Sequence, residues 1–213
     1  SALAGGMVFA NIYDGQTIDA RLVDTTWASN TPKTAWNRKV KVLDLPKNHL
    51  VPTLNEPVKA YEAIPAKNLI VTPKGEKVID FGQNIVGWER VKLSGKEGDR
   101  VRITHAEVLD KDGNFYTENM REAKTTSLFI LNGKGTETFE PRHTFYGFRY
   151  IKVEGLEGDI RLEDFEAVPV CSGFDRIGSF SSSNPVTFSF LPVSKITYRS
   201  SICSSSSIAC SFV

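Results

Sequence analysis

The chain has 213 residues, of which 40% are hydrophobic and 24% are charged, an ordinary composition for a soluble globular protein. Its formal net charge of +1, with basic residues scattered among acidic ones, is not that of a protein that binds nucleic acid or an anionic membrane surface. No apolar run has the length of a membrane span, so we expect neither nucleic acid nor a membrane as a partner.

Residues 1–57 are predicted to be the end of a preceding β domain followed by a connector. The first part, which includes NIYDGQTIDAR, is too short to bury a core by itself. Residues 44–57, DLPKNHLVPTLNEP, contain three prolines and little periodicity, which is typical of a connecting segment. The N-terminus lacks a basic stretch followed by a long apolar one, so we predict no signal peptide in this chain, and its cellular location stays unknown.

Residues 58–177 are predicted to form an antiparallel β-sandwich. Short segments such as EKVIDFG, DRVRITHAEVL and FRYIKVEGL alternate apolar and polar residues, as half-buried strands do. Turn sequences such as SGKEGD, DKDGN and NGKGTE separate the strands, and no stretch has the apolar periodicity of a long helix. The predicted fold class is therefore all-β, with an N-terminal extension and a poorly structured C-terminal tail.

That tail is assigned to residues 178–213. From Ser181 onward, 12 of 33 residues are serine, and the acidic residues end before this point. Ser-rich segments are usually linkers, but this one also contains Phe, Ile, Val and Leu, and the abrupt change of composition suggests a frame-shifted sequence. Cys171, Cys203 and Cys210 have no metal-binding spacing and are interpreted as isolated thiols.

The run D-K-D-G-N at 110–114 fits the composition of a calcium loop, of a sugar-binding loop or of a hairpin turn. An EF-hand loop has oxygen ligands at its first, third and fifth positions, a glycine at the sixth, and helices on both sides. Here Gly113 does not stand at the sixth position of a loop that begins at Asp110, and the flanking segments alternate like strands. Because glycine tolerates positive φ and aspartate caps turns, the sequence predicts a hairpin, with no metal and no cofactor.

His105, Glu107 and Glu118 are the candidates for acid–base chemistry. A glycosidase needs two carboxyl groups that face each other across the substrate. Glu107 follows His105 by two residues, so both are expected on one face of a strand. We interpret that face as a polar one that is exposed or lies between domains, and we predict no catalytic residue in this chain.

Two segments combine aromatic and polar residues as sugar-binding sites do. DFGQNIVGW at 80–88 predicts either such a site or a bulged strand corner at Gly82. EPRHTFYGFRYIKVEG at 140–155 predicts either a stacking platform or a core and its rim, with Phe148 and Tyr150 on one strand face and Arg149 on the other. The candidate carbohydrate-binding residues are Asp80, Gln83, Asn84, Trp88, Tyr146, Arg149 and Tyr150.

DFGQNIVGW, HAEVLDKDGNFYTENMREAKTT and EPRHTFYGFRYIKVEG occur in an order and spacing that resemble the bacterial α-L-rhamnosidases. The resemblance covers about residues 58–170 and concerns the concanavalin-like, jelly-roll β-sandwich domain that precedes the catalytic domain of that family. NIYDGQTIDAR, with Trp27 and Trp36, resembles the end of the family's N-terminal β domain, and GSFSSSNP resembles the entry into its catalytic domain.

The resemblance implies a bacterial, periplasmic or secreted parent enzyme that removes terminal α-L-rhamnose with inversion. The catalytic carboxylates of this family lie in a helical (α/α)6 barrel that we do not find in this sequence, so the resemblance assigns no catalytic residue here. The expected partner is that barrel, with this domain as its scaffold, and exposed apolar surface is expected to cause self-association. The alternative is a lectin-like domain that binds rhamnose-containing glycans.

Overall fold

The structure, a computed structural model, describes residues 5–26, 29 and 43–173. Within these ranges the secondary structure consists of β-strands and three single-turn 3-10 helices, η1 (Ala20–Leu22), η2 (Glu118–Met120) and η3 (Leu162–Asp164). The all-β fold class predicted from the sequence is confirmed. No helix in the described part of the chain has the length and apolar character needed to cross a membrane.

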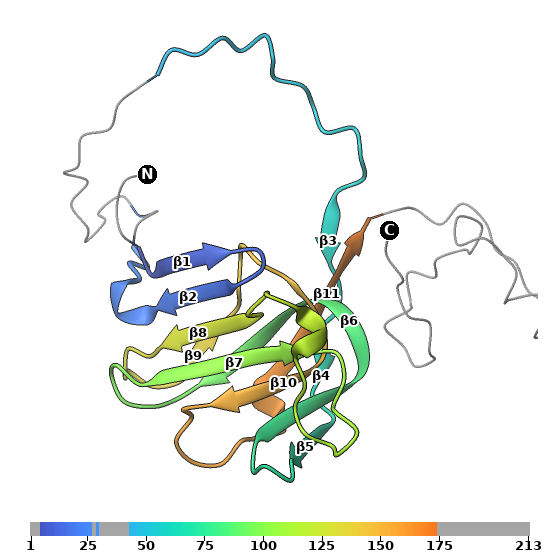
Figure 1. Ribbon diagram of the computed structural model, residues 1–213. Helices are drawn as coiled ribbons and strands as arrows, with labels where there is room; N and C mark the ends of the chain where they lie inside the picture. The colour runs from blue at the N-terminus through green and yellow to red at the C-terminus, as the bar shows by residue number, and fades with distance from the viewer. Residues whose placement is uncertain (1–4, 27–28, 30–42, 174–213) are drawn as a thin grey trace, which may run out of the picture.

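In the described part of the chain, eleven strands are hydrogen-bonded into one curled sheet (Figure 1). The main path through it runs β1-β2-β8-β7-β10-β6-β11-β3, while β4 pairs with β11, and β5 and β9 pair with β6. In chain order the strands are β1 (Met7–Asn11), β2 (Gly15–Asp19), β3 (Val58–Ala60), β4 (Ile64–Pro65), β5 (Asn68–Val71), β6 (Lys77–Leu93), β7 (Arg100–Ala106), β8 (Thr126–Ile130), β9 (Glu137–Phe139), β10 (Tyr146–Glu154) and β11 (Phe165–Ser172).

The long strand β6 explains why the sheet curls. Its first residues pair with β5 and β10, and its last residues pair with β11 and β9. A strand that changes partners along its length belongs to two layers of the fold, so the sheet closes around the side chains between them. The alternating apolar residues of β6 point into this interior, as the sequence pattern predicts.

The interior is filled by apolar side chains from β6, β7, β8, β10 and β11. The largest are phenylalanines that are almost entirely buried: Phe81, Phe129, Phe148 and Phe165. The rings of Phe81 and Phe148 meet edge to face, with their centres 5.7 Å apart. Burying each such side chain stabilises the fold by about 1.5–3 kcal/mol, so this cluster contributes substantially to the sheet's stability.

The N-terminal hairpin is part of the same sheet. β1 and β2 pair antiparallel, but β2 pairs in parallel with β8, with Gly15 opposite Thr126. The sheet is therefore mixed: the strands from β3 to β11 pair antiparallel with one another, as predicted for the sandwich, and the one parallel pair in the described ranges joins them to the N-terminal extension. A side chain at Gly15 would clash, since a Cβ there would lie 1.9 Å from the carbonyl oxygen of Thr126. Glycine at this position thus permits the close approach of β2 to β8.

Residues 43–57 contain no strand or helix and run as an arc outside the sheet toward β3 (Figure 1). Their apolar side chains are exposed, to 92% at Leu54.

Cys171 lies half-buried in β11.

Several sequence predictions concern residues outside the described ranges. These predictions concern the serine-rich tail at 178–213 and the residues Trp27, Trp36, Cys203 and Cys210.

Candidate functional site

A bulge in β6 brings several of the predicted sugar-binding residues together. Residues 81–84 of β6 stand against the single residue Arg149 of β10. Gly82 in the bulge has a φ of +81°, a left-handed conformation that glycine adopts without strain. The bulged corner that the sequence predicts at Gly82 is confirmed, and Asp80, Gln83 and Asn84 lie in or beside it.

Asp80 and Arg149 form a bidentate ion pair at this bulge. Nε and Nη2 of Arg149 donate to Oδ1 and Oδ2 of Asp80 at 2.8 and 2.9 Å, and the backbone N–H of Gly82 donates to Oδ1 at 2.6 Å. Burial by itself would raise the pKa of Asp80, but the hydrogen bonds from Arg149 and Gly82 and the charge of Arg149 outweigh it and hold this pKa below its usual value. The Asp80 carboxylate is therefore engaged in holding the bulge.

Tyr150 lies on the outer face of β10, where the guanidinium carbon of Arg149 is 5.0 Å from the centre of its ring. The expectation that Tyr150 and Phe148 share a strand face is wrong, because Phe148 is fully buried and Tyr150 is half-buried. The cause is the register shift of β10 against β6 between these two residues, which turns both Arg149 and Tyr150 outward.

Glu107, a candidate acid–base residue, binds two asparagine side chains. Its Oε1 accepts from Nδ2 of Asn84 at 3.1 Å, and its Oε2 accepts from Nδ2 of Asn119 at 3.2 Å. Glu118 is exposed on η2, next to Asn119, and Gln83 is half-buried in the bulge. Glu107 is thus an acceptor in an amide network at the surface.

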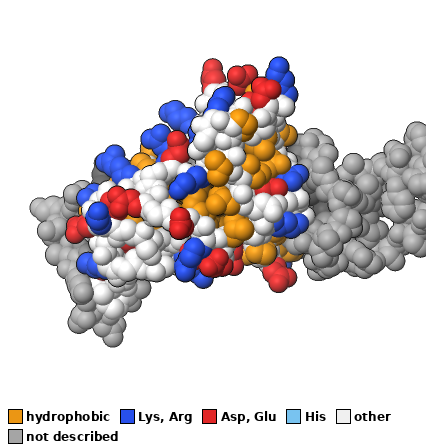
Figure 2. Space-filling model, turned by 90° about the horizontal axis from the view of Figure 1, so that it is seen from below, with side chains coloured by type: hydrophobic (Ala, Val, Ile, Leu, Met, Phe, Trp, Pro, Cys, Tyr) orange, Lys and Arg blue, Asp and Glu red, His pale blue; other side chains and the backbone are white. Residues whose placement is uncertain are grey.

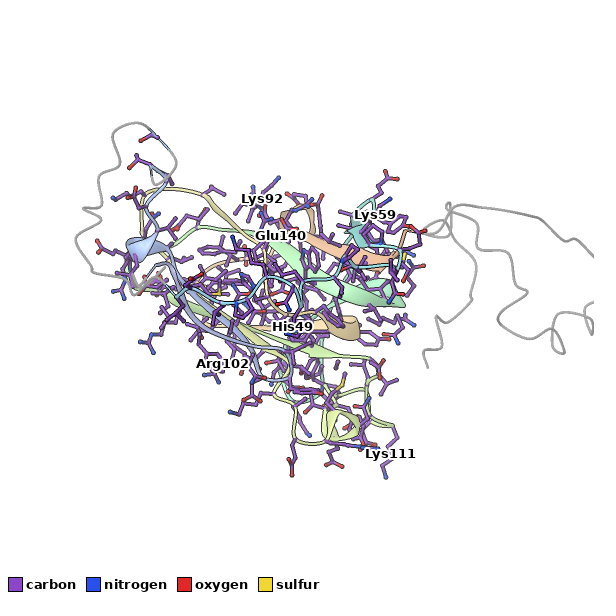
Figure 3. All side chains as sticks on the ribbon, turned by 90° about the horizontal axis from the view of Figure 1, so that it is seen from above. His49, Lys59, Lys92, Arg102, Lys111 and Glu140 are labelled. Atoms are coloured by element: carbon purple, nitrogen blue, oxygen red, sulfur yellow. The ribbon has the colours of Figure 1, made fainter. Side chains whose placement is uncertain are left out.

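Trp88 lies on the outer face of β6, beyond the bulge. Its indole Nε1 donates to Oε1 of Glu140 at 2.7 Å, and Arg90 contacts Oε2 of Glu140 at 3.2 Å; Glu140 is labelled in Figure 3. Burial would raise the pKa of Glu140, but the hydrogen bonds from Arg90 and Trp88 hold it below its usual value. The predicted sugar-binding residues thus divide into a group at the bulge and a second group around Trp88.

Tyr146 belongs to neither group, because its side chain is in the core. It is 4% exposed and stacks on His105, with the ring centres 3.9 Å apart. Burial, together with the nearby Glu89 carboxylate, raises the pKa of Tyr146 to about 12. One face of its ring is covered by the imidazole, so Tyr146 does not present a stacking surface to a ligand outside the fold.

Sequence reasoning missed Glu89, the partner of His105 inside the fold. Nε2 of His105 lies 2.8 Å from Oε2 of Glu89, Nδ1 lies 2.8 Å from the carbonyl oxygen of Thr125, and both side chains are completely buried. The second carboxylate oxygen of Glu89, Oε1, is buried without a hydrogen-bond partner. The alternation of β6 contains the missing signal, since Glu89 occupies an inward position two residues before the buried Val91.

The interpretation of His105 as part of an exposed or interdomain polar face is therefore wrong. His105 points inward with the apolar residues of β7, where the carboxylate from β6 and a backbone carbonyl satisfy its ring nitrogens. A polar residue at an inward position needs such partners, and they come from segments that are distant in the sequence.

The D-K-D-G-N run is a hairpin turn, as predicted. The N–H of Asp110 donates to the carbonyl oxygen of Asn114 at 2.8 Å, and Gly113 has a φ of +82°. Oδ1 of Asp110 accepts hydrogen bonds from the backbone N–H groups of Asp112 and Asn114, so this carboxylate is used within the turn. Among the residues that the structure describes, no group of three or more His, Cys, Asp or Glu side chains is placed to hold a metal ion.

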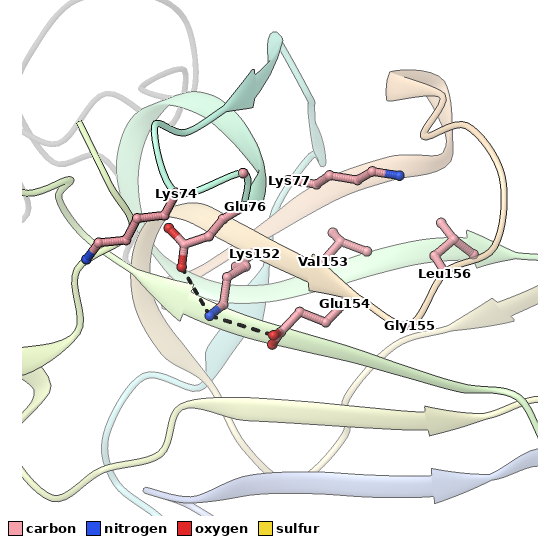
Figure 4. Close-up of a pocket in the computed structure, with 9 residues that line it drawn as sticks. Lys74, Glu76, Lys77, Lys152, Val153, Glu154, Gly155 and Leu156 are labelled. Carbon is pink, nitrogen blue, oxygen red and sulfur yellow. Dashed lines mark hydrogen bonds and ion pairs between the residues drawn. The ribbon is translucent and has the colours of Figure 1, made fainter. Parts of the chain in front are cut away.

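Two adjoining concavities lie on the outer face of the sheet. The first has a volume of about 340 Å³ and is formed by residues 74–77 together with the end of β10 and the turn that follows it (Figure 4). The second, of about 200 Å³, is lined by Arg100, Arg102, Leu128, Glu154 and Gly155, of which the last two also line the first. The predicted sugar-binding residues line neither concavity.

Three exposed hydrophobic side chains, Ile12, Tyr13 and Phe145, form what we call the end patch, where the N-terminal hairpin turns. Ile12 and Tyr13 are 52% and 71% exposed, and Phe145 is 49% exposed. The carbonyl oxygen of Ile12 accepts from Oγ1 of Thr144 at 3.3 Å, which places the hairpin turn beside Phe145. Figure 2 shows further hydrophobic side chains in a band across the face seen from below, bordered by charged ones.

Residues 70–171 match the family model of the bacterial alpha-L-rhamnosidase concanavalin-like domain. The chain is 40% identical over 159 residues to an alpha-L-rhamnosidase of Streptomyces avermitilis, an alignment that covers 74% of this chain and 15% of the relative. Among solved structures it is similar to the native rhamnosidase of Aspergillus terreus, with a TM-score of 0.79, 34% identity, and coverage of 87% of this chain and 22% of the other.

The structure of the Streptomyces avermitilis alpha-L-rhamnosidase in complex with L-rhamnose is also similar, with a TM-score of 0.76 and 34% identity over 87% of this chain and 18% of the other. The chain thus spans about a fifth, or less, of the length of the curated relatives and of these two structures.

Proposed function

Because residues 70–171 carry the concanavalin-like domain of the bacterial α-L-rhamnosidase family, we propose that the chain acts as the non-catalytic scaffold of such an enzyme. The whole enzyme removes terminal α-L-rhamnose with inversion, and its catalytic carboxylates lie in a helical (α/α)6 barrel. The β-sheet described here orients that barrel and covers part of its surface.

The observation that carries this proposal is the way in which the candidate acid–base residues are used. An inverting glycosidase holds a water molecule between an acid and a base about 6.5–9.5 Å apart, on opposite sides of the sugar. Here His105 is in the core, and Glu107 is bound by two asparagine side chains. Glu118 is exposed on a single helical turn and lines neither concavity. His105 and Glu107 thus have structural partners, and Glu118 stands on the exposed turn, which supports a catalytic site elsewhere in the whole enzyme.

The end patch supports the scaffold role. Ile12, Tyr13 and Phe145 leave an apolar surface at one end of a rigid sheet, and such surfaces are typical of contacts between domains. The hairpin that carries two of them is held by hydrogen bonds from Thr144 and from the N–H of Thr125 to its backbone. The patch is therefore preorganised for a partner. In the isolated chain we expect the same surface to cause self-association through Phe145. Tyr146 is buried, so we expect it not to contribute.

The test is to combine this chain with the Streptomyces avermitilis relative from which the homologous segment has been deleted. We expect the two to form a complex in size-exclusion chromatography, with recovery of α-L-rhamnoside hydrolysis. Phe145→Ser and Tyr13→Ser should weaken the complex, while Leu69→Ser, at an exposed position on β5, should not. Hydrolysis of an aryl α-L-rhamnoside by this chain alone, lost on Glu107→Gln or Glu118→Gln, would refute the non-catalytic role.

A lectin-like role is the second candidate, and the outward orientation of Trp88, Arg149 and Tyr150 favours it. It requires that Trp88 or Tyr150 stacks on a sugar ring while neighbouring polar groups bind its hydroxyls. Calorimetric titration with L-rhamnose and with a rhamnose-bearing oligosaccharide decides between the two roles. Binding with a Kd below about 1 mM, lost in a Trp88→Ala variant that still folds, would support a sugar-binding role in place of the scaffold role. A titration that produces no heat of binding with either sugar would support the scaffold role.

A further inference from the structure

The two concavities on the outer face of the sheet adjoin each other. They share Glu154 and Gly155, and the strand register explains why. Glu154 of β10 stands opposite Arg102 of β7, and Arg102 stands opposite Leu128 of β8. Side chains directly opposite each other on neighbouring strands have Cβ atoms about 4.5–5.5 Å apart, so these three form a row across the sheet. We call this surface, from residues 74–77 to Leu128, the outer-sheet groove.

The outer-sheet groove is basic, although the chain as a whole is nearly neutral. The formal net charge of the chain is +1, whereas the groove lining has an excess of three positive charges. Its cationic residues are Lys74, Lys77, Arg100, Arg102 and Lys152, and its acidic residues are Glu76 and Glu154. Positive charge is therefore concentrated here relative to the rest of the molecule.

The acidic residues are already engaged with Lys152. Its Nζ lies 3.4 Å from Oε1 of Glu76 and 3.8 Å from Oε1 of Glu154, as the dashed lines in Figure 4 show. Arg100 and Arg102 are exposed, and neither forms an ion pair with a residue in the described ranges. The two guanidinium groups are thus available to an anionic ligand.

We propose that the outer-sheet groove binds an acidic glycan, an oligosaccharide whose sugar units carry carboxylate or sulfate groups. The fork of N–H groups on a guanidinium matches the two oxygens of a carboxylate or sulfate. Strands β7 and β10 also bring threonine and lysine donors to the same face, in the row of Thr104 and Lys152. An extended, shallow surface that carries several charged side chains fits a chain of linked sugar rings better than a compact small molecule.

The ligand class follows from what the groove contains. Single-stranded nucleic acid is usually held by bases stacked on aromatic rings, and no aromatic residue lines either concavity. The choice of a glycan among the remaining polyanions rests on the proposed function, which places this chain in an enzyme that acts on glycans. The site is separate from Trp88 and from the Asp80–Arg149 pair, neither of which lines the groove.

The experiment is calorimetric titration of the chain with three defined probes: hexagalacturonic acid, a chondroitin sulfate oligosaccharide and neutral maltohexaose. We expect binding of at least one acidic probe and none of the neutral one. The binding should weaken between about 0.01 M and 0.15 M salt, because the screening length falls from about 30 Å to about 8 Å. The carboxylated and the sulfated probe together identify which anionic group the groove prefers.

The decisive variant is Arg100→Gln/Arg102→Gln, which should bind the acidic probe at least tenfold more weakly. The matched control is Lys92→Gln/Lys111→Gln, which removes the same charge from exposed lysines that lie away from Arg102 (Figure 3). Lys74→Gln, in a turn, gives a second groove variant if the arginine double variant does not fold. Equal weakening by the control, equal binding of maltohexaose, or tighter binding of an oligonucleotide than of either acidic glycan would overturn the proposal.

The groove and the scaffold role can fail independently. If the chain forms the complex with the deleted relative but binds no acidic probe at low salt, the glycan-binding proposal is wrong and the scaffold proposal stands. If the chain binds an acidic probe but does not form the complex, the glycan-binding proposal is supported and the scaffold proposal is wrong.

Discussion

His105 and Glu89 form a fully buried pair in which Nε2 lies 2.8 Å from Oε2. The pair joins β7 to β6 across β10, and the ring of Tyr146 stacks on the imidazole. Nδ1 of His105 and the carbonyl oxygen of Thr125 extend the contact to the loop that anchors the N-terminal hairpin. One buried polar contact therefore links the sheet to the surface that we propose as a docking site.

Removal of one partner of this pair should be strongly destabilising. In His105→Leu, the Glu89 carboxylate stays buried without a hydrogen-bond donor, so we expect a loss of about 3–5 kcal/mol in the free energy of unfolding. The double variant His105→Leu/Glu89→Leu removes both polar groups and should lose less. Urea unfolding measures the difference, with His143→Leu at an exposed position as the control. A double variant that is less stable than His105→Leu would contradict this account.

The Asp80–Arg149 pair predicts a dependence of stability on pH. The pKa of Asp80 is lower in the folded protein than its usual value, because the hydrogen bonds from Arg149 and Gly82 outweigh burial. The pair therefore stabilises the fold above the unfolded pKa of about 3.9, and the benefit is lost as pH falls through the folded pKa.

Asp80→Asn should accordingly lose about 1.5–3 kcal/mol of stability at neutral pH, and the gap to the wild type should narrow below pH of about 4. Asp112→Asn, in the exposed hairpin turn, is the matched control and should show no such gap. The measurement is urea unfolding at a series of pH values. A gap that stays constant down to a pH of about 2 would show that the Asp80 carboxylate is not the source of the stabilisation.

Tyr146 should ionise at a higher pH than an ordinary tyrosine. Burial, with the Glu89 charge nearby, raises its pKa to about 12, two units above the usual value for tyrosine. Rapid pH jumps followed by absorbance near the phenolate band should therefore show a step near pH 12 that is absent in Tyr146→Phe. Tyr13→Phe, at a position 71% exposed, is the control and should leave the step near pH 12 in place. Persistence of the late step in Tyr146→Phe would assign it to another residue.

Gly87 should tolerate no side chain. A Cβ at this position would lie 2.0 Å from the carbonyl oxygen of Val168, so alanine must separate β6 from β11. We expect Gly87→Ala to lose more than about 3 kcal/mol of stability, in the range of severe steric and core changes. Gly113→Ala is the matched control: its φ is positive, but its Cβ would meet no atom within 4 Å, so its cost should be about 1–2 kcal/mol. Thermal unfolding that ranks the two variants in the opposite order would contradict the predicted contact.

The sequence by itself determined the features that depend on neighbours along the chain. Alternation of apolar and polar residues predicted an all-β fold, because successive side chains of a strand point to opposite faces. The hairpin at Asp110–Asn114 and the bulge at Gly82 followed from local turn chemistry. Three long motifs also indicated the α-L-rhamnosidase family, and the family model that matches residues 70–171 confirms this resemblance.

Only the tertiary structure decided which distant segments meet. The parallel pairing of β2 with β8 depends on the packing of Gly15 against Thr126, and no local pattern encodes it. The Glu89–His105 pair arises because two inward-facing positions of β6 and β7 meet across the core. The separation of Tyr150 from Phe148 arises from a shift in strand register, and a shift of one residue moves a side chain to the opposite face of a sheet. Alternation specifies which residues can face inward, but long-range pairing selects their partners.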